Sequence, residues 1–148
     1  MVSSILVKPR IALDTNLLVA AVTKPGGASG RIVKACRDGK IELVASEATI
    51  READLVVGAG WLARVTSPEA VETLLNELRE RAIRVVPSGD VRDLPLKDPG
   101  DLRMLEAALA GGAAYVVTTD REFLSHRGYG EVEFVTPHQF WRLIPFPE

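Results

Sequence analysis

Short apolar runs alternate with longer segments of helical periodicity along most of the chain. Five runs rich in β-branched residues predict strands. They are RIALD (10–14), KIELVAS (40–46), IRVVP (83–87), AYVVTTD (114–120) and VEFVTP (132–137). Strands that alternate with helices predict an α/β fold, a three-layer α/β/α arrangement with a central parallel sheet of about five strands and helices on both faces.

The helices are predicted from amphipathic spacing and from their start signals. Val71, Leu74, Leu75 and Leu78 follow the i, i+3, i+4, i+7 spacing of one helix face. Capping residues precede five of the segments, three of them followed by proline at the first helical position. These caps are Ser29, Ser46, Ser67 before Pro68, Asp98 before Pro99, and Thr136, which forms a Thr-x-x-Gln capping box with Gln139. The segment 121–130 is expected to be a short turn.

Length and composition limit the class of protein. A chain of 148 residues is most simply one domain, here residues 1–148, because a single core is the usual solution at this size. With 47% hydrophobic and 26% charged residues, it has the composition of a soluble globular protein. The longest apolar runs are shorter than the ~18 residues that a membrane span needs, and the first residues lack the features of a signal peptide. We therefore expect a cytoplasmic protein with no membrane partner.

The single cysteine and the net charge narrow the chemistry further. Cys36 lies on the apolar stripe of its predicted helix, which favours a buried structural thiol, and one cysteine excludes an internal disulfide and a multi-cysteine zinc site. The formal net charge is −2, whereas a protein that holds nucleic acid by charge alone is normally basic. If nucleic acid is the substrate, local basic residues or a bound metal must supply the positive charge.

Four acidic residues from distant parts of the chain are expected to meet at one edge of the sheet. Asp14 and Asp120 end predicted strands, and Asp101 and Glu52 lie in the first and second turns, respectively, of helices that begin at the same edge. Chemistry in an open parallel sheet collects at the carboxyl ends of the strands. Carboxylates so close together repel one another unless a cation compensates them, and oxygen ligands are those that Mg²⁺ and Mn²⁺ prefer. Such a metal can activate water for attack on a phosphodiester.

Each acid also has a purely structural interpretation. Asp14, Asp98 and Asp120 could simply cap the helices that follow them, and Asp101 could complement the positive end of a helix. A solvated helix face would explain Glu52 together with Glu47 and Asp54. The hypothesis of a metal site therefore depends on the joint placement of the acids and not on any one of them.

Several segments together resemble the PIN-domain ribonucleases, including the toxins of VapC-like toxin–antitoxin pairs. The resemblance covers Ile11 to Phe140 and is carried by IALDTNLLVAAV, VASEATIRE, KDPGDLRMLEAALAGGAAYVVTTDREFL and VEFVTPHQF. It differs from the common family pattern at Gly100, where the family often has an acid, and at Thr119, where the family often has glycine.

The resemblance implies a function and roles for particular residues. It implies a PIN-like fold and hydrolysis of RNA with Mg²⁺ or Mn²⁺, an antitoxin partner, and a homodimer or higher homo-oligomer. The implied catalytic residues are Asp14, Glu52, Asp101 and Asp120, with metal ligands Asp14, Asp101 and Asp120, and supporting residues Asn16, Asp98 and Thr118. Arg121, directly after Asp120, is the candidate for RNA binding. Trp61 is a candidate for a dimer or antitoxin surface.

Two other classes compete with the nuclease hypothesis. A catalytically silent PIN-like module that binds RNA or protein would keep the fold without the activity, although retention of all four acids argues against it. An aspartyl phosphatase also places an aspartate at the end of its first strand, but it needs a second aspartate two positions later, where this chain has Asn16. Dependence on Mg²⁺ or Mn²⁺ without a phospho-enzyme would separate the nuclease from the phosphatase.

Overall fold

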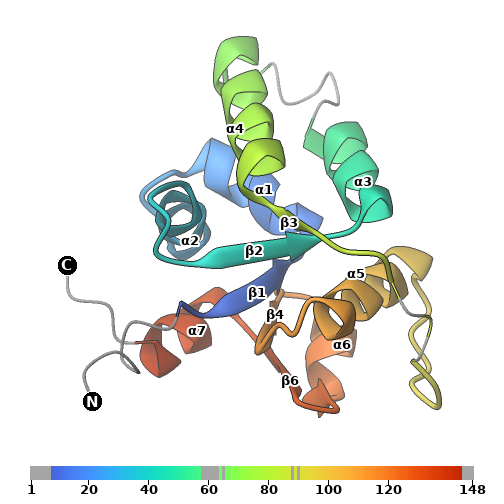
Figure 1. Ribbon diagram of the computed structural model, residues 1–148. Helices are drawn as coiled ribbons and strands as arrows, with labels where there is room; N and C mark the ends of the chain where they lie inside the picture. Colours follow the sequence, from blue (N-terminus) through green and yellow to red (C-terminus); the bar gives the residue numbers. More distant parts are fainter. Residues whose placement is uncertain (1–7, 58–63, 65, 88, 90, 145–148) are drawn as a thin grey trace.

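A computed structural model of the protein describes residues 8–57, 64, 66–87, 89 and 91–144, and these residues form one mostly parallel sheet with helices on both faces (Figure 1). The strands are β1 (Arg10–Leu13), β2 (Glu42–Ala45), β3 (Ile83–Arg84), β4 (Tyr115–Val117), β5 (Gly128–Tyr129) and β6 (Val132–Val135). The helices are α1 (Thr15–Thr23), α2 (Ala28–Arg37), α3 (Glu47–Val57), α4 (Pro68–Arg81), α5 (Pro99–Ala110), α6 (Arg121–Ser125) and α7 (Pro137–Leu143). The predicted α/β class is confirmed.

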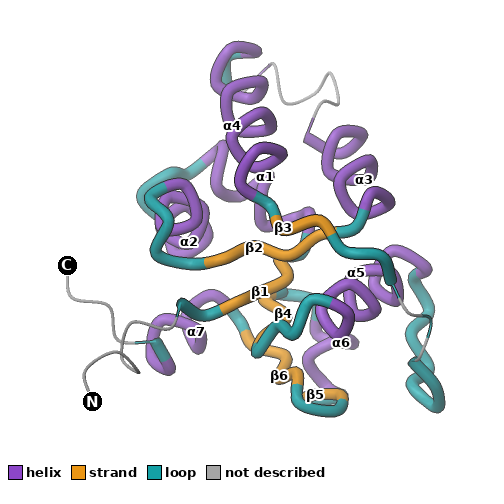
Figure 2. The backbone as a smooth tube through the Cα atoms, in the orientation of Figure 1, coloured by secondary structure: helices purple, strands orange, loops and turns teal. Residues whose placement is uncertain are grey.

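The strand order is β3-β2-β1-β4-β6-β5, and all neighbours are parallel except β5 and β6 (Figure 2). The sheet extends from β1 in both directions, with β2 and β3 on one side and β4, β6 and β5 on the other. The strand order therefore reverses between β1 and β4, and the carboxyl ends of these two strands lie next to each other. In open α/β sheets this is the usual position of a ligand site.

Alternate strand residues face two separate apolar cores. On one face, Ile11 and Val117 pack with residues of α1, α2, α4 and α7. On the other face, Ala12 and Val116 pack with residues of α5 and α6, among them the fully buried Phe123. This alternation of period two is what the pleat of a strand imposes.

Most predicted helix starts are confirmed. The side chains of Ser67, Asp98 and Thr136 each accept a hydrogen bond from the first turn of the helix that follows. At α7 both bonds of the capping box are present, with Gln139 N donating to Thr136 Oγ1 at 3.1 Å and Thr136 N donating to Gln139 Oε1 at 2.9 Å.

Two local predictions are wrong. Ser29 does not cap α2, because the helix begins at Ala28 with Gly27 as its N-cap. The chain turns closely over this start, and a Cβ at Gly30 would lie 2.1 Å from the carbonyl oxygen of Pro25. The segment 121–130 is not simply a turn, because it contains α6 and the edge strand β5, so the sheet has six strands.

Within the described residues, no helix combines the length and apolar character that crossing a membrane requires. Cys36 is buried in α2, as predicted, and burial raises the pKa of its thiol to about 12. A thiol with that pKa is almost entirely protonated at neutral pH and is a poor nucleophile.

Candidate active site

Asp14 is both a helix cap and the most firmly held acid of the site. It follows β1 directly, and its backbone N–H donates to the carbonyl of Val117 at 3.0 Å, which ties it to β4. Its Oδ1 accepts a hydrogen bond from the backbone N–H of Asn16 at 3.0 Å, and its Oδ2 accepts one from the Thr118 hydroxyl at 2.6 Å. Because the residue is only 8% exposed and both oxygens are hydrogen-bonded, the carboxylate is held in one orientation.

Thr118 joins the ends of two neighbouring strands through one hydroxyl group. Its side chain is completely buried, and its Oγ1 donates to Asp14 while accepting the backbone N–H of Asp120 at 3.1 Å. Asp120 in turn caps α6, because its Oδ1 accepts from the backbone N–H of Glu122 at 2.8 Å. The strand ends therefore hold both aspartates by hydrogen bonds, some within the following turn and one across the sheet from Thr118 to Asp14.

The start of α5 brings two further acids to the site. Asp98 is the N-cap, with its Oδ1 accepting from the backbone N–H of Gly100 at 2.8 Å, and Pro99 fixes the first helical position. Asp101 follows in the first turn, where the partial positive charge of the helix end favours an acidic side chain.

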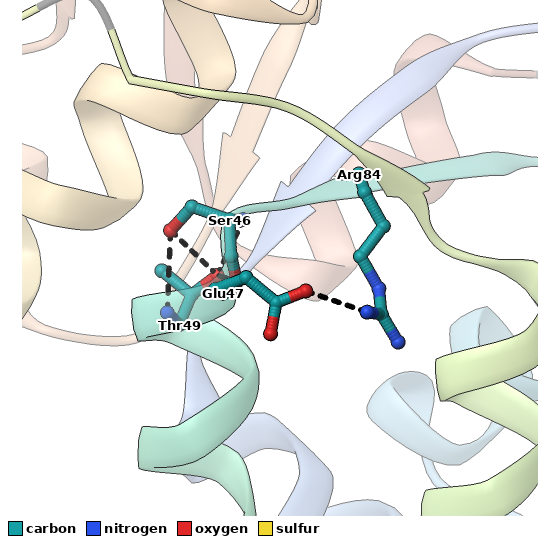
Figure 3. A network of polar contacts seen from close by, with 4 residues as sticks. All are labelled: Ser46, Glu47, Thr49 and Arg84. Carbon is teal, nitrogen blue, oxygen red and sulfur yellow. Dashed lines mark hydrogen bonds and ion pairs between the residues drawn. The ribbon is translucent and has the colours of Figure 1, made fainter.

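The start of α3, which places Glu52, is fixed by a small polar network (Figure 3). The Thr49 backbone N–H donates to Ser46 Oγ at 3.3 Å, and the Ser46 N–H donates to Thr49 Oγ1 at 2.8 Å, so the predicted cap at Ser46 is confirmed. An ion pair of 2.5 Å between Arg84 and Glu47 connects β3 to the first residue of the helix. Glu52 lies one turn further along α3.

These elements surround one cavity of about 120 Å³. The predicted site residues that line it come from the segments after β1 and β4 and from α3 and α5. They are Asp14, Asn16, Glu52, Asp98, Asp101 and Asp120. Thr118 lies behind them, buried, as a support of Asp14. The expectation that the acids converge on one edge of the sheet thus matches their positions in the structure.

Burial and like charges raise the pKa of two of the acids. The pKa of Asp101 rises to about 7 because the carboxyl is partly desolvated and because Asp98, Asp14, Asp120 and Glu52 surround it. The pKa of Glu52 is also raised, first by burial and then by the charges of Asp98 and Asp14, although Arg103 acts in the opposite direction. The cluster therefore holds more negative charge than its protein surroundings compensate.

The donor set fits a hard divalent cation. Carboxylate oxygens are the ligands that Mg²⁺ and Mn²⁺ prefer, and the uncompensated charge around Asp101 is what such an ion neutralises. Among the described residues, however, no three His, Cys, Asp or Glu side chains already form a group placed to hold a metal ion. Side-chain adjustment on binding is therefore part of any metal site here.

Two features of the cavity were not predicted from the sequence. Asp54, which a solvated helix face would explain, instead pairs with Arg79 of α4, and both residues line the cavity. Gly100 also lines it, directly against the carboxylate of Glu52. Neither contact has a local sequence signal, because each joins two elements through the tertiary fold.

Arg121 is the first residue of α6 and is exposed next to Asp120. Its guanidinium has no ion pair with any residue that the structure describes. Lys97, another basic residue near the cluster, is paired with Glu122 at 3.5 Å. Trp61 lies outside the described residues.

Comparison with known proteins agrees with this architecture. The fold is similar to that in the crystal structure of VapBC2 from Rickettsia felis bound to a DNA fragment from their promoter, with a TM-score of 0.56 and 19% identity over 86% of this chain and 98% of that chain. At that identity the likeness shows a shared fold. A search of curated proteins gave no match. The sequence pattern of the PIN domain matches residues 10–122, which is most of the chain, and the protein therefore belongs to the PIN domain family.

Proposed function

We propose that the protein is a metal-dependent endoribonuclease that hydrolyses RNA phosphodiester bonds with Mg²⁺ or Mn²⁺. The observation that supports this most is the gathering of acids from four separate elements around one cavity, Asp14, Glu52, Asp101 and Asp120. Bringing like charges together raises the free energy of the folded protein, so a structural role alone does not account for the cluster. A bound cation would both compensate the charge and provide a function for it.

In this proposal Asp14, Asp101 and Asp120 hold the cation, and Glu52 completes the catalytic set. The cation supplies the Lewis acidity that phosphodiester hydrolysis requires and offsets the charge of the attacked phosphate. Asp14 can contribute because each of its oxygens accepts only one protein hydrogen bond and keeps a further lone pair.

The residues around the acids keep them oriented. The Thr118 hydroxyl and the Asn16 backbone N–H hold the Asp14 carboxylate in place before any ligand binds. The Asp98 cap fixes the start of α5 and hence the position of Asp101. Without a cation, the raised pKa lets the Asp101 carboxyl keep its proton to a higher pH than an ordinary aspartate, and the cation would displace that proton.

The exposed Arg121 is the residue that we assign to the RNA backbone, since it follows Asp120 directly and an acidic cluster needs a cationic neighbour to accept a polyanion.

We further propose that the protein acts in the cytoplasm as the toxin of a toxin–antitoxin pair, as a homodimer or higher homo-oligomer with an antitoxin partner. Similarity to the fold seen in VapBC2 supports that role.

Cleavage of labelled single-stranded and structured RNAs by the purified protein tests the proposal. We expect cleavage with Mn²⁺ or Mg²⁺ that EDTA abolishes and that Asp14→Asn reduces by more than about 100-fold, since even residues behind the ligands of metal sites contribute 10- to 100-fold. Asp38→Asn, at the end of α2 and paired with Lys34, is the matched control and should cleave normally. Binding of RNA without cleavage, unchanged by EDTA and by Asp14→Asn, would instead support a silent binding module.

A further inference from the structure

Gly100 and Glu52 are in unusually close contact across the cavity. A Cβ added at Gly100 would lie 2.6 Å from Oε1 of Glu52, 2.9 Å from Oε2 and 3.1 Å from Cδ. All three positions are closer than ordinary van der Waals contact. The Glu52 carboxylate therefore occupies the space that any side chain at position 100 would enter.

The backbone gives no other reason for glycine at this position. Gly100 is the second residue of α5, and its φ is not in the left-handed region that favours glycine. Alanine is the better helix former, so local preference alone would select a residue with a side chain. The close approach of the carboxylate is what remains to explain the glycine.

The Glu52 carboxylate has no hydrogen bond or ion pair with the part of the chain that the structure describes. The charges of Asp98 and Asp14 repel it, and the charge of Arg103 attracts it more weakly. Its position beside the other acids therefore depends on the space that the absence of a side chain at Gly100 leaves at the start of α5.

We propose that Gly100 is a positioning residue that admits the Glu52 carboxylate into the acid cluster, an inference that rests on the proposed metal-dependent function. Positions 52 and 100 then share one space, which holds one carboxylate. A methyl group at position 100 displaces Glu52, and an aspartate at position 100 takes its place.

Titration with Mn²⁺ of the purified protein and its variants measures this dependence without relying on cleavage. Glu52→Ala and Gly100→Ala should each weaken Mn²⁺ binding by about tenfold, the lower end of the range for residues that support metal sites. In the double variant the loss should equal that of either single change, because both act through the same carboxylate. Gly26→Ala is the matched control, since a Cβ there meets nothing within 4 Å, and it should bind Mn²⁺ like the parent protein.

An exchange variant tests the shared space directly. Glu52→Ala combined with Gly100→Asp should restore Mn²⁺ affinity to within about threefold of the parent protein, whereas a purely structural role of Gly100 would not be rescued by an acid. Additive losses in the Glu52→Ala and Gly100→Ala pair, or normal Mn²⁺ binding by Gly100→Ala, would overturn the inference.

A crystal structure of metal-free Gly100→Ala separates this inference from the proposed function. We expect the fold to be kept and the Glu52 side chain to leave the cavity, because its carboxylate is the flexible end that gives way. If the parent protein bound no Mn²⁺, the proposed function would fail while this displacement could still be observed. If the single variant Gly100→Ala did not fold but the double variant Glu52→Ala/Gly100→Ala did, the contact between the two residues would be confirmed. If neither the single nor the double variant folded, the inference would be refuted.

Discussion

The acids at the strand ends and the acids on the helices are held in different ways. Asp14 and Asp120 are fixed by hydrogen bonds that involve the Thr118 hydroxyl or the backbone of the next helix. Glu52 and Asp101 have no such partner among the described residues, and the pKa of each is raised by burial and by neighbouring charge. One half of the cluster is thus preorganised, and the other half is under electrostatic strain.

This difference separates the acids that stabilise the fold from those whose presence lowers its stability and is explained by the proposed activity. Hydrogen bonds to a buried carboxylate stabilise the fold and the site together. Unpaired carboxylates on α3 and α5 repel the neighbouring acids and destabilise the metal-free protein. Changes on the two sides should therefore have opposite effects on the free energy of unfolding.

The largest expected effect is on the strand side, where Thr118→Val removes the hydroxyl and keeps the shape. This leaves Asp14 Oδ2 and the Asp120 N–H without their buried partner, and we expect a loss of about 2 kcal/mol in the free energy of unfolding. Urea unfolding in EDTA measures it. Thr23→Val is the control, because the Thr23 hydroxyl bonds only to carbonyls of its own helix at an exposed position. Equal losses in the two variants would remove the distinction between the two halves of the cluster.

On the helix side, Asp101→Asn should stabilise the metal-free protein at pH 8. The folded pKa of about 7 exceeds the ordinary aspartate pKa of 3.8, so over the range between these values the folded carboxyl keeps a proton that the unfolded chain has released. The Asp101 contribution therefore becomes less favourable as pH rises from about 4 to about 7. Because the group is partly exposed and asparagine loses the favourable interaction with the helix end, we expect a gain of only about 1 kcal/mol.

The pH dependence provides the check on that gain. Thermal unfolding in EDTA should show Asp101→Asn more stable than the parent protein at pH 8 but hardly more stable at pH 4. At pH 4 the folded carboxyl is protonated and the unfolded one is close to its own pKa, so most of the charge repulsion is absent. Saturating Mg²⁺ should reverse the order at pH 8. A stabilisation that is the same at every pH would mean that charge repulsion is not its cause.

The two halves of the cluster also differ in how far the sequence predicts them. The positions of Asp14 and Asp120 follow from strands that end in polar residues, because parallel strands end at one edge. The contact between Gly100 and Glu52 could not be predicted, because it depends on how α3 packs beside α5. The edge strand β5 was missed for a related reason, since two residues paired with β6 leave no periodic pattern.

The smallest expected effect concerns the support of α3, where Arg84→Gln removes the ion pair with Glu47 (Figure 3). Both side chains are substantially exposed, at 47% and 61%, so the loss should be below about 0.5 kcal/mol and should disappear in high salt. The Ser46 and Thr49 bonds remain and keep the helix start in place. Mn²⁺ affinity should therefore be unchanged. If it fell as much as in Glu52→Ala, the helix side of the cluster would depend on surface charge, and the room provided by Gly100 would not be sufficient to position Glu52.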